Sequence, residues 1–174
     1  MKINEIRVIV PKFDASESWS EAEVLGAMVF LWSQQDYYRQ GSVESALANL
    51  LPIIRHRNFC LFIKNGAPIG YVNWAYFSEQ EAADYAQRQH EYAHYLETCA
   101  QEQAGKQLWL LSSFFPTGEV HLSRRILRDH VFKNQSVRFL HHKPADAPLS
   151  KAFSGSHFEH HHTPYTAAAA GAVQ

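Results

Sequence analysis

The sequence predicts a single domain of the α/β (α+β) class, in which helices flank a mixed sheet. Two apolar, aromatic stretches, residues 68–75 and residues 109–116, are rich in β-prone side chains and close with turn residues, as buried strands do. A segment with a helical pattern separates them. A strand, a helix and a second strand in this order suit a crossover connection, which joins parallel strands. We therefore expect the two strands to be parallel neighbours in one sheet.

Length and composition agree with one globular domain. The chain has 174 residues, which is enough for one hydrophobic core and too few for two comfortable ones. It is 46% hydrophobic and 19% charged, a composition that disfavours disorder. We divide it into an N-terminal arm or edge strand over residues 1–19, a folded domain over residues 20–163 and a flexible, low-complexity tail over residues 164–174.

Charge and cysteine content exclude several classes of partner. Lys plus Arg number 16 and Asp plus Glu number 17, so no overall positive field would attract nucleic acid or an anionic membrane. Cys60 and Cys99 are the two cysteines and make no disulfide framework. No apolar run approaches the roughly 18 residues of a membrane span, and the N-terminus lacks an apolar stretch of signal length. We expect a soluble, cytoplasmic protein.

The N-terminal third of the chain predicts a strand or arm followed by two helices. Residues 6–10 alternate weakly and stop at a proline, as an edge strand does. Ser20 and Glu23 form a capping box that begins the first helix. Ser42 caps the second helix, which we expect to end at Pro52 and the basic residues that follow. The predicted apolar faces are Leu25, Met28, Val29 and Trp32 on the first helix, and Ala46, Leu47, Leu50 and Leu51 on the second.

The rest of the chain predicts a hairpin, a long helix and two further strands. Asn65-Gly66 is a hairpin turn between two β-prone runs. Ser78 and Glu81 form a second capping box, which begins the long helix. The expected strands cover residues 59–63, 69–76, 109–115 and 137–141, and the expected helices cover residues 78–103 and 120–132.

Several motifs, taken together and in order, resemble one family. They begin with residues 24–26 and 31–33, followed by Arg39, and continue with residues 51–55. Residues 68–75 are similar to that family's strand Pro-Val-Ala-Tyr-Cys-Ser-Trp-Ala, residues 109–118 to its Trp-Phe-Ile-Asp-Trp-Ile-Ala-Pro-Phe-Gly, and residues 136–138 to its Ala-Ile-Arg. The family is that of the RTX toxin-activating lysine acyltransferases, the hemolysin-activating proteins of Gram-negative bacteria. The resemblance runs from residue 24 to residue 155, most of the chain.

This resemblance implies an activity, a fold and partners. A fatty acyl group would move from acyl carrier protein to the ε-amino group of a lysine in a protoxin, on an acetyltransferase-like (GNAT-like) fold. Acyl-acyl carrier protein would be the acyl donor, and no other cofactor is implied. The sequence leaves the oligomeric state open, with a homodimer as one option.

Both catalytic side chains of the family are replaced in this chain. The family histidine just before the arginine corresponds to Tyr38, and the aspartate of the Trp-Phe-Ile-Asp-Trp strand corresponds to Ser112. A lysine amine must lose a proton before it attacks a thioester, and the resulting oxyanion must be stabilised. Neutral tyrosine is a far weaker proton acceptor than histidine at neutral pH, and serine supplies no carboxylate. Within the matched motifs we expect substrate-binding side chains at Arg39, Tyr71, Trp74, Trp109 and Arg138.

Two hypotheses therefore stay open. The first is an acyltransferase with a divergent centre, in which Tyr38 is a hydrogen-bond donor or poor base and Ser112 is its partner. The second is a catalytically inactive relative that binds acyl carrier protein, an acyl lipid or a toxin-like partner. His56 or His121 could also enter the vacated site. A basic group could meet an acidic carrier protein, or could simply solvate helix ends: Arg55, Arg57, Arg124, Arg125 and Arg128.

The histidine spacing invites a weaker hypothesis, a metal site. His90 and His94 are four residues apart and Glu91 follows the first, which is the outline of the zinc-protease motif His-Glu-x-x-His. No third ligand is apparent, so we expect a solvated helix face and no metal. The histidine tract within residues 158–162 is equally well explained by a surface segment.

Overall fold

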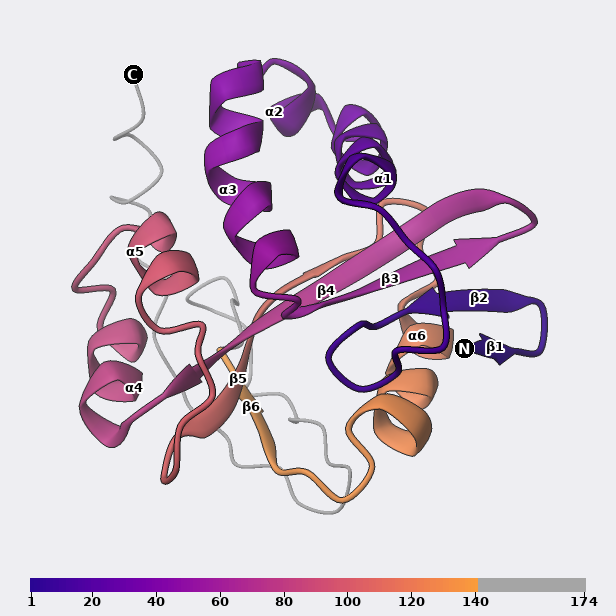
Figure 1. Cartoon of the computed structure of the whole chain (residues 1–174). Coiled ribbons are helices and arrows are strands. Elements are labelled where there is room, and N and C mark those ends of the chain that lie inside the picture. The colour runs from indigo at the N-terminus through magenta and orange to yellow at the C-terminus, as the bar shows by residue number, and fades with distance from the viewer. Residues whose placement is uncertain (141–174) are drawn as a thin grey trace, which may run out of the picture.

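A six-stranded sheet is the centre of the structure, a computed structural model that describes residues 1–140 (Figure 1). The strands lie in chain order, and all neighbours are antiparallel except β5 and β6, which are parallel. The strands are β1 (Lys2–Ile3), β2 (Ile6–Ile9), β3 (Phe59–Lys64), β4 (Ala67–Phe77), β5 (Gln107–Phe114) and β6 (Val137–Phe139). The helices are α1 (Glu21–Ser33), α2 (Asp36–Arg39), α3 (Val43–Arg55), α4 (Glu79–Ala86), α5 (Tyr92–Glu97) and α6 (Val120–Ile126), which a π-helical turn (Leu127–Val131) continues. The predicted class, a mixed sheet flanked by helices, is confirmed.

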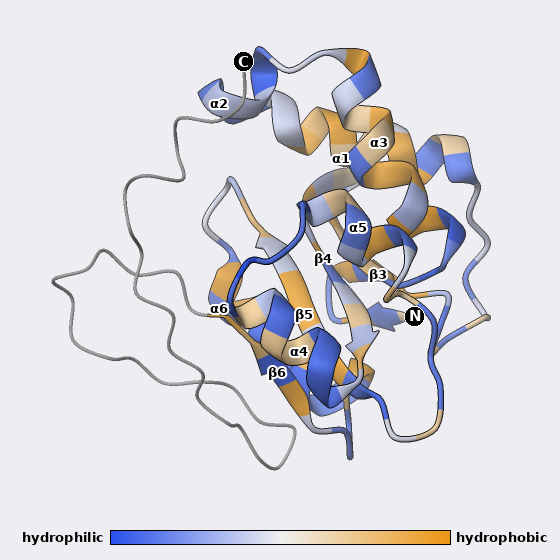
Figure 2. Cartoon of the chain, turned by 90° about the vertical axis from the view of Figure 1, so that its left-hand side faces the viewer, coloured by the Kyte–Doolittle hydropathy of each residue, from blue (hydrophilic) through white to orange (hydrophobic). Residues whose placement is uncertain are grey.

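Helices cover both faces of this sheet. α1 and α3 lie over one face, where they pack against Phe59 and Leu61 of β3. α6 and its π-helical turn cover the other face, in the core that contains Cys60 and Phe62. Alternate side chains of a strand point to opposite faces, so β3 contributes to both cores. α4 and α5 enclose a third, smaller core around Phe77. Figure 2 shows apolar residues gathered on α1, α3 and β5.

The predicted hairpin between β3 and β4 is confirmed. The two strands are antiparallel, and Asn65 and Gly66 lie between them with φ angles of 52° and 78°. Positive φ at both central residues is the requirement of a type I′ turn, whose twist matches that of the strands it joins. The Asn-Gly pair therefore encodes this part of the sheet locally.

The predicted parallel pairing of the two central strands is wrong. β4 and β5 are neighbours but run antiparallel, with Phe77 opposite Gln107 and Tyr71 opposite Phe114. The chain leaves β4 and enters β5 at the same end of the sheet, because α4 and α5 turn back instead of crossing it. Antiparallel neighbours need no crossover. The parallel crossover of this fold is formed instead by β5, α6 and β6.

The single helix predicted over residues 78–103 is two short helices. α4 begins at the predicted capping box of Ser78 and Glu81 and ends after Ala86. Arg88, just beyond it, has a φ of 55°, and a left-handed residue ends a helix. The polar residues 87–91 offer no apolar side chain that could bury and hold a continuous helix, so the chain breaks there.

α1 and α3 bury stripes that differ from the predicted ones. The buried side chains are Val24, Met28 and Leu31 on α1, and Ala46, Leu50, Ile53 and Ile54 on α3. Val29 and Leu47, which were expected inside, are 41% and 36% exposed. α1 is apolar nearly all round, so the spacing of its apolar residues does not define one face. α3 continues through Pro52, because the two isoleucines that follow still reach the core, and ends at the basic residues as predicted, with Arg55 last and His56 as its C-cap.

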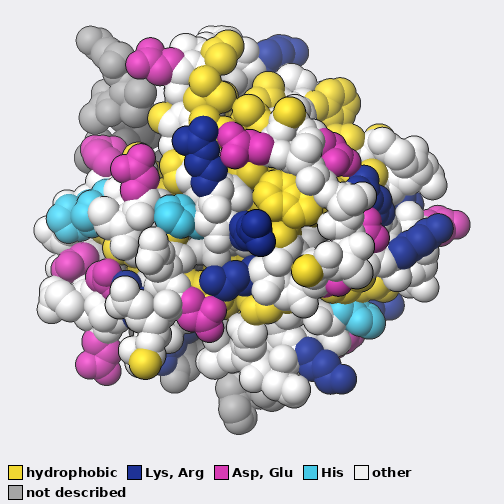
Figure 3. Space-filling view, in the orientation of Figure 1, with side chains coloured by type: hydrophobic (Ala, Val, Ile, Leu, Met, Phe, Trp, Pro, Cys, Tyr) yellow, Lys and Arg dark blue, Asp and Glu magenta, His cyan; other side chains and the backbone are white. Residues whose placement is uncertain are grey.

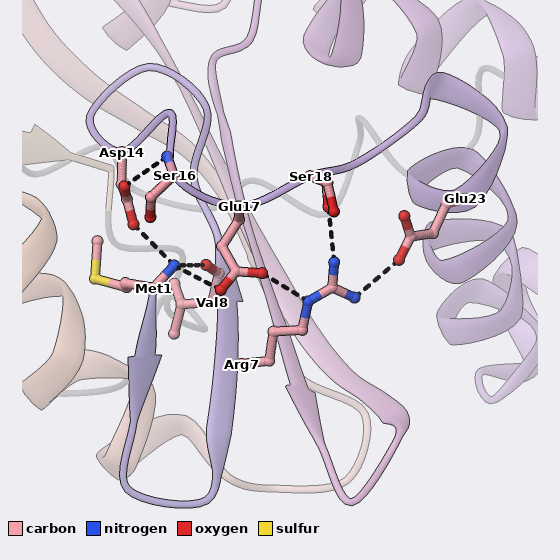
Figure 4. A network of polar contacts seen from close by, with 8 residues as sticks. All are labelled: Met1, Arg7, Val8, Asp14, Ser16, Glu17, Ser18 and Glu23. Atoms are coloured by element: carbon pink, nitrogen blue, oxygen red, sulfur yellow. Dashed lines mark hydrogen bonds and ion pairs between the residues drawn. The ribbon is translucent and has the colours of Figure 1, made fainter.

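The first residues, expected as an arm or edge strand, are tied into the domain. β2 lies between β1 and β3, so β1 is the edge strand. The Met1 ammonium pairs with Asp14 at 2.8 Å and with Glu17 at 3.3 Å (Figure 4). Arg7 pairs with Glu17 and with Glu23 of α1, each at 2.9 Å. This network connects β2 to the start of α1.

Some expectations concern residues outside the described part of the chain. These are the tail over residues 164–174, the histidine tract within residues 158–162 and the end of the last strand at residue 141. Within residues 1–140, no helix combines the length and the apolar character that a membrane crossing requires. Cys60 and Cys99 are both buried as free thiols.

Candidate functional site

A cavity of about 730 Å³ lies against β4 and β5, on the face that α1 and α3 cover. Aromatic rings and small polar side chains form most of its wall. Its lining residues include Trp32, Tyr37, Tyr38, Leu50, Ile53, Tyr71, Glu91, Tyr92, Leu111 and Ser112. Tyr38 of α2 and Ser112 of β5, far apart in the sequence, therefore line the same cavity. These are the two positions at which the sequence resemblance predicts the counterparts of the family histidine and aspartate.

Aromatic contacts hold Tyr38. Its ring centroid lies 4.8 Å from that of Trp32, 5.3 Å from that of Phe114 and 5.1 Å from that of Tyr37. Burial raises the pKa of Tyr38 above its ordinary value, and the neighbouring Tyr37 adds to the rise. The phenol is therefore neutral at physiological pH, where it donates a hydrogen bond but is a poor proton acceptor.

A bulge in β5 turns two successive residues toward the cavity. Asn73 of β4 pairs with Ser112, but the next residue, Trp74, pairs with Leu110, which leaves Leu111 unmatched. Successive side chains of a regular strand point to opposite faces, and an extra residue breaks this alternation. Leu111 and Ser112 accordingly both line the cavity.

Two further tyrosine hydroxyls are held by side-chain donors. Trp32 Nε1–H donates to Tyr71 Oη at 2.8 Å and joins α1 to β4. Asn73 Nδ2–H donates to Tyr92 Oη at 3.0 Å and joins β4 to the start of α5. Burial raises the pKa of both tyrosines, and these hydrogen bonds only partly oppose it. Ser112 lies close enough to Tyr71 to lower its pKa slightly, as a hydroxyl that donates to the phenol oxygen does. The lining of the cavity thus combines neutral phenols with the hydroxyl groups of Ser45 and Ser112.

Sequence reasoning missed several residues of this site, among them Asn73, Glu91 and Tyr92. Asn73 is fully buried in an otherwise apolar strand, and a polar side chain in such a run is a signal that could have been used. Glu91 and Tyr92 reach the cavity because α5 folds back against α3. No local pattern predicts this approach, because it depends on the break between α4 and α5.

Of the predicted substrate-binding residues, Tyr71 lines the cavity and the others lie elsewhere. Trp74 belongs to the core beneath α6, on the opposite face of the sheet. Trp109 is buried in the small core beneath α4 and α5. Arg39 forms an exposed ion pair on α2. Arg138 of β6 donates a hydrogen bond to a side chain of β5. In the described structure, none of these four lines the cavity.

The histidine pair differs from the arrangement that the spacing suggested. His94 lies in α5, but His90 precedes this helix, and their ring centroids are 4.2 Å apart. In the part of the chain that the structure describes, no three His, Cys, Asp or Glu side chains gather as a metal site would require.

The basic side chains do not form one surface. Arg55 and Arg57 line a separate hollow of about 470 Å³, together with Lys12 and His56. The other three arginines of the expected group belong to α6 and its π-helical turn, which cover the opposite face of the sheet. His56 therefore lies in this second hollow, not in the aromatic cavity, and His121 lies on α6.

The architecture is consistent with the acetyltransferase-like class of α/β proteins: a largely antiparallel sheet, one parallel crossover and an aromatic cavity on one face. Residues 17–152 match the model of the RTX toxin acyltransferase family, which is well over half of the chain. The chain belongs to this family.

Curated relatives agree with this assignment at low identity. The chain is 25% identical over 109 residues to the RTX-II toxin-activating lysine-acyltransferase ApxIIC of Actinobacillus pleuropneumoniae, which covers 63% of this chain and 65% of that protein. It is 24% identical over 128 residues to the leukotoxin-activating lysine-acyltransferase LktC serotype A1 of Mannheimia haemolytica, and the match covers 74% of this chain and 73% of that protein. It is 32% identical over 63 residues to the protein-lysine myristoyltransferase HlyC of Escherichia coli, and the match covers 36% of this chain and 37% of that protein. The chain thus spans just under two thirds of the length of ApxIIC.

Proposed function

We propose that this protein transfers a fatty acyl group from acyl carrier protein to the ε-amino group of a lysine in a protoxin. The observation that supports the proposal is that Tyr38 and Ser112, the residues expected at the family's two catalytic positions, line the same cavity. Trp32, Leu50 and Ile53 give this cavity apolar walls, which suit an acyl chain. Membership of the family supports the same reaction type.

The chemistry requires one bond to form and one to break. The lysine nitrogen bonds to the thioester carbon, the carbon–sulfur bond breaks, and the thiol of the carrier's arm leaves with a proton. Tyr38 is neutral and donates hydrogen bonds, while Ser112 carries no charge. We therefore assign Tyr38 as a donor and poor base and Ser112 as its partner, and expect slower transfer than a histidine and aspartate would give.

The surface beside the cavity suits a protein partner. Among residues 1–140, the large apolar side chains with substantial exposure belong to α1, α2 and α3: Val29, Phe30, Tyr37, Tyr38, Val43 and Leu47. Figure 3 shows apolar side chains gathered over the part of the molecule where these helices lie. Apolar surface of this kind marks interaction sites. We infer that the carrier protein or the protoxin docks here, and a cytoplasmic location follows from this donor. A homodimer through the same surface is the alternative.

A second candidate function is binding without turnover. The replacement of histidine by Tyr38 and of aspartate by Ser112, which the resemblance implies, supports it, because removal of such a catalytic group commonly costs several orders of magnitude in rate. The partner would then be acyl carrier protein, an acyl lipid or a toxin-like protein, held in the same cavity.

Intact-mass analysis distinguishes the two candidates. A protoxin is incubated with acyl-loaded carrier protein and either the unaltered protein or a variant that combines Tyr38→His with Ser112→Asp. Acylation by the unaltered protein well above the rate without protein supports the enzyme. Acylation by the variant alone supports the binding protein. No acylation by either, with a protoxin that another family member modifies, contradicts the transfer reaction.

A further inference from the structure

Tyr92 lines the cavity, and no family motif accounts for it. We propose that Tyr92, positioned by Asn73, donates a hydrogen bond to the acyl oxygen of a fatty acyl ligand, beside a second donor, Tyr71, that Trp32 positions. The inference rests on the proposed function and locates the head group of the acyl chain within that site. The ligand chemistry is an oxygen with negative charge: the carboxylate of a fatty acid, or the oxyanion formed during transfer.

The hydrogen bonds leave the proton of each phenol available. A tryptophan N–H can only donate, so Tyr71 Oη is the acceptor in its 2.8 Å contact with Trp32. In the same way, Tyr92 Oη accepts from Asn73 Nδ2–H at 3.0 Å. A hydroxyl that accepts one hydrogen bond still has its own proton to donate. Within residues 1–140 no acceptor takes the proton of Tyr92, and its side chain lines the cavity.

The environment of Asn73 argues against a purely structural role. The side chain is fully buried, and its Oδ1 atom has no hydrogen-bond partner within residues 1–140. An unpaired buried acceptor is destabilising, so an apolar residue would pack more favourably in this strand. Asn73 also lies next to the bulge that turns Ser112 into the cavity. The buried amide therefore destabilises the fold, and its hydrogen bond to Tyr92 gives a functional reason for its presence in the strand.

In the transfer reaction, these donors act on the thioester oxygen. As the amine nitrogen bonds to the carbonyl carbon, the π electrons move to the oxygen, which becomes negative. Neutral phenols aimed at this oxygen stabilise it without any charge of their own. When the carbonyl re-forms, the carbon–sulfur bond breaks, the thiolate takes up the proton released by nitrogen, and both phenols keep their protons.

A binding measurement tests the donor without turnover. Titrations with dodecanoate and with dodecyltrimethylammonium, whose head group accepts no hydrogen bond, are compared for the unaltered protein and for Tyr92→Phe. We expect Tyr92→Phe to weaken dodecanoate binding about five- to twentyfold and to leave the cationic amphiphile unaffected. Tyr95→Phe is the matched control, because it removes a hydroxyl from the same helix at a position that does not line the cavity. Equal affinity of Tyr92→Phe and the unaltered protein, or equal losses for both ligands, would overturn the proposal.

Asn73→Leu tests the positioning role. Leucine is similar in size and has no hydrogen-bond donor, so it releases the Tyr92 hydroxyl without adding a charge that would repel dodecanoate. The expected loss in dodecanoate affinity equals that of Tyr92→Phe, and the double variant loses no more than either single one. A loss that is the same for both amphiphiles, or one that adds to that of Tyr92→Phe, would show that Asn73 has only a structural role.

Transfer assays separate this inference from the proposed function. With an active protein, Tyr92→Phe should lower kcat at least tenfold with little change in KM for the lysine substrate. If Tyr92→Phe changes neither kcat nor dodecanoate binding, Tyr92 is not the hydrogen-bond donor, and the proposed transfer function is unaffected. If the unaltered protein transfers nothing but its dodecanoate binding depends on Tyr92, the function fails and the donor site stands.

Discussion

A β-carbon on Gly70 would lie 2.0 Å from Cδ1 of Phe115, so the phenyl ring occupies the space that any larger residue in β4 would need. Phe115 also packs on Phe62, with ring centroids 5.4 Å apart. The family strands that resemble β4 and β5 carry alanine at both positions. This chain therefore combines a smaller residue at position 70 with a larger one at position 115, and we interpret the two changes as coupled.

The coupling can be measured by a double-mutant cycle. Gly70→Ala alone should destabilise the fold by about 1–3 kcal/mol, because the ring must move out of a packed core. Phe115→Ala alone should cost about 1–3 kcal/mol, because its half-buried ring leaves a void. The double variant should be at least about 1 kcal/mol more stable than the sum predicts, since its alanines fit one another. Urea unfolding gives all four values, and additive losses would contradict the coupling.

The ion pair of the Met1 ammonium predicts a loss of stability in acid. Hydrogen bonding to this ammonium lowers the pKa of Asp14 from 3.8 to about 2, and Ser16 assists. The unfolded chain therefore binds the proton first, and the contribution of Asp14 is complete above its ordinary pKa and is lost as the pH falls toward 2. Urea midpoints measured from pH 2 to pH 7 should show this decline. Asp14→Asn should be less stable at pH 7 and flatter over the acid range, and two parallel curves would argue against the pair.

Arg57→Gly should stabilise the protein. Arg57 follows the C-terminus of α3 with a φ of 59°, and its N–H donates to Ile54 O while the next N–H donates to Ile53 O. This is a Schellman ending, whose left-handed position favours glycine by about 1 kcal/mol. The gain should appear as a higher melting temperature. Arg57→Ala is the control, since it removes the same charge but keeps the β-carbon, and an equal gain there would point to charge instead of backbone conformation.

Features that depend on neighbouring residues could be predicted from the sequence, whereas features that depend on long-range packing could not. The β3–β4 hairpin follows from Asn65-Gly66, and three helix starts follow from Ser20, Ser42 and Ser78, because these signals act within a few residues. The direction of β5 depends on whether the intervening helices cross the sheet, which no local pattern encodes. The sequence motifs brought Tyr38 and Ser112 to attention but not Tyr92, whose approach to β4 depends on that same packing. The misplacement of Trp74 could have been avoided. Successive side chains of a strand alternate between its two faces, so Trp74, three residues after Tyr71, must point to the opposite face.

Glu91→Gln should weaken the use of a lysine substrate. Glu91 is the only ionisable carboxylate among the described residues that line the cavity. It lies at the start of α5, exposed and next to Tyr92, where a substrate ammonium can pair with it. An exposed pair contributes about 0.2–1 kcal/mol, so KM for a lysine peptide should rise about two- to fivefold with little change in kcat. The effect should vanish in high salt, because exposed charges are screened. Glu97→Gln removes a charge from the same helix outside the cavity lining and should leave KM unchanged. A similar rise in both variants would show that net charge, and not a contact in the cavity, attracts the substrate.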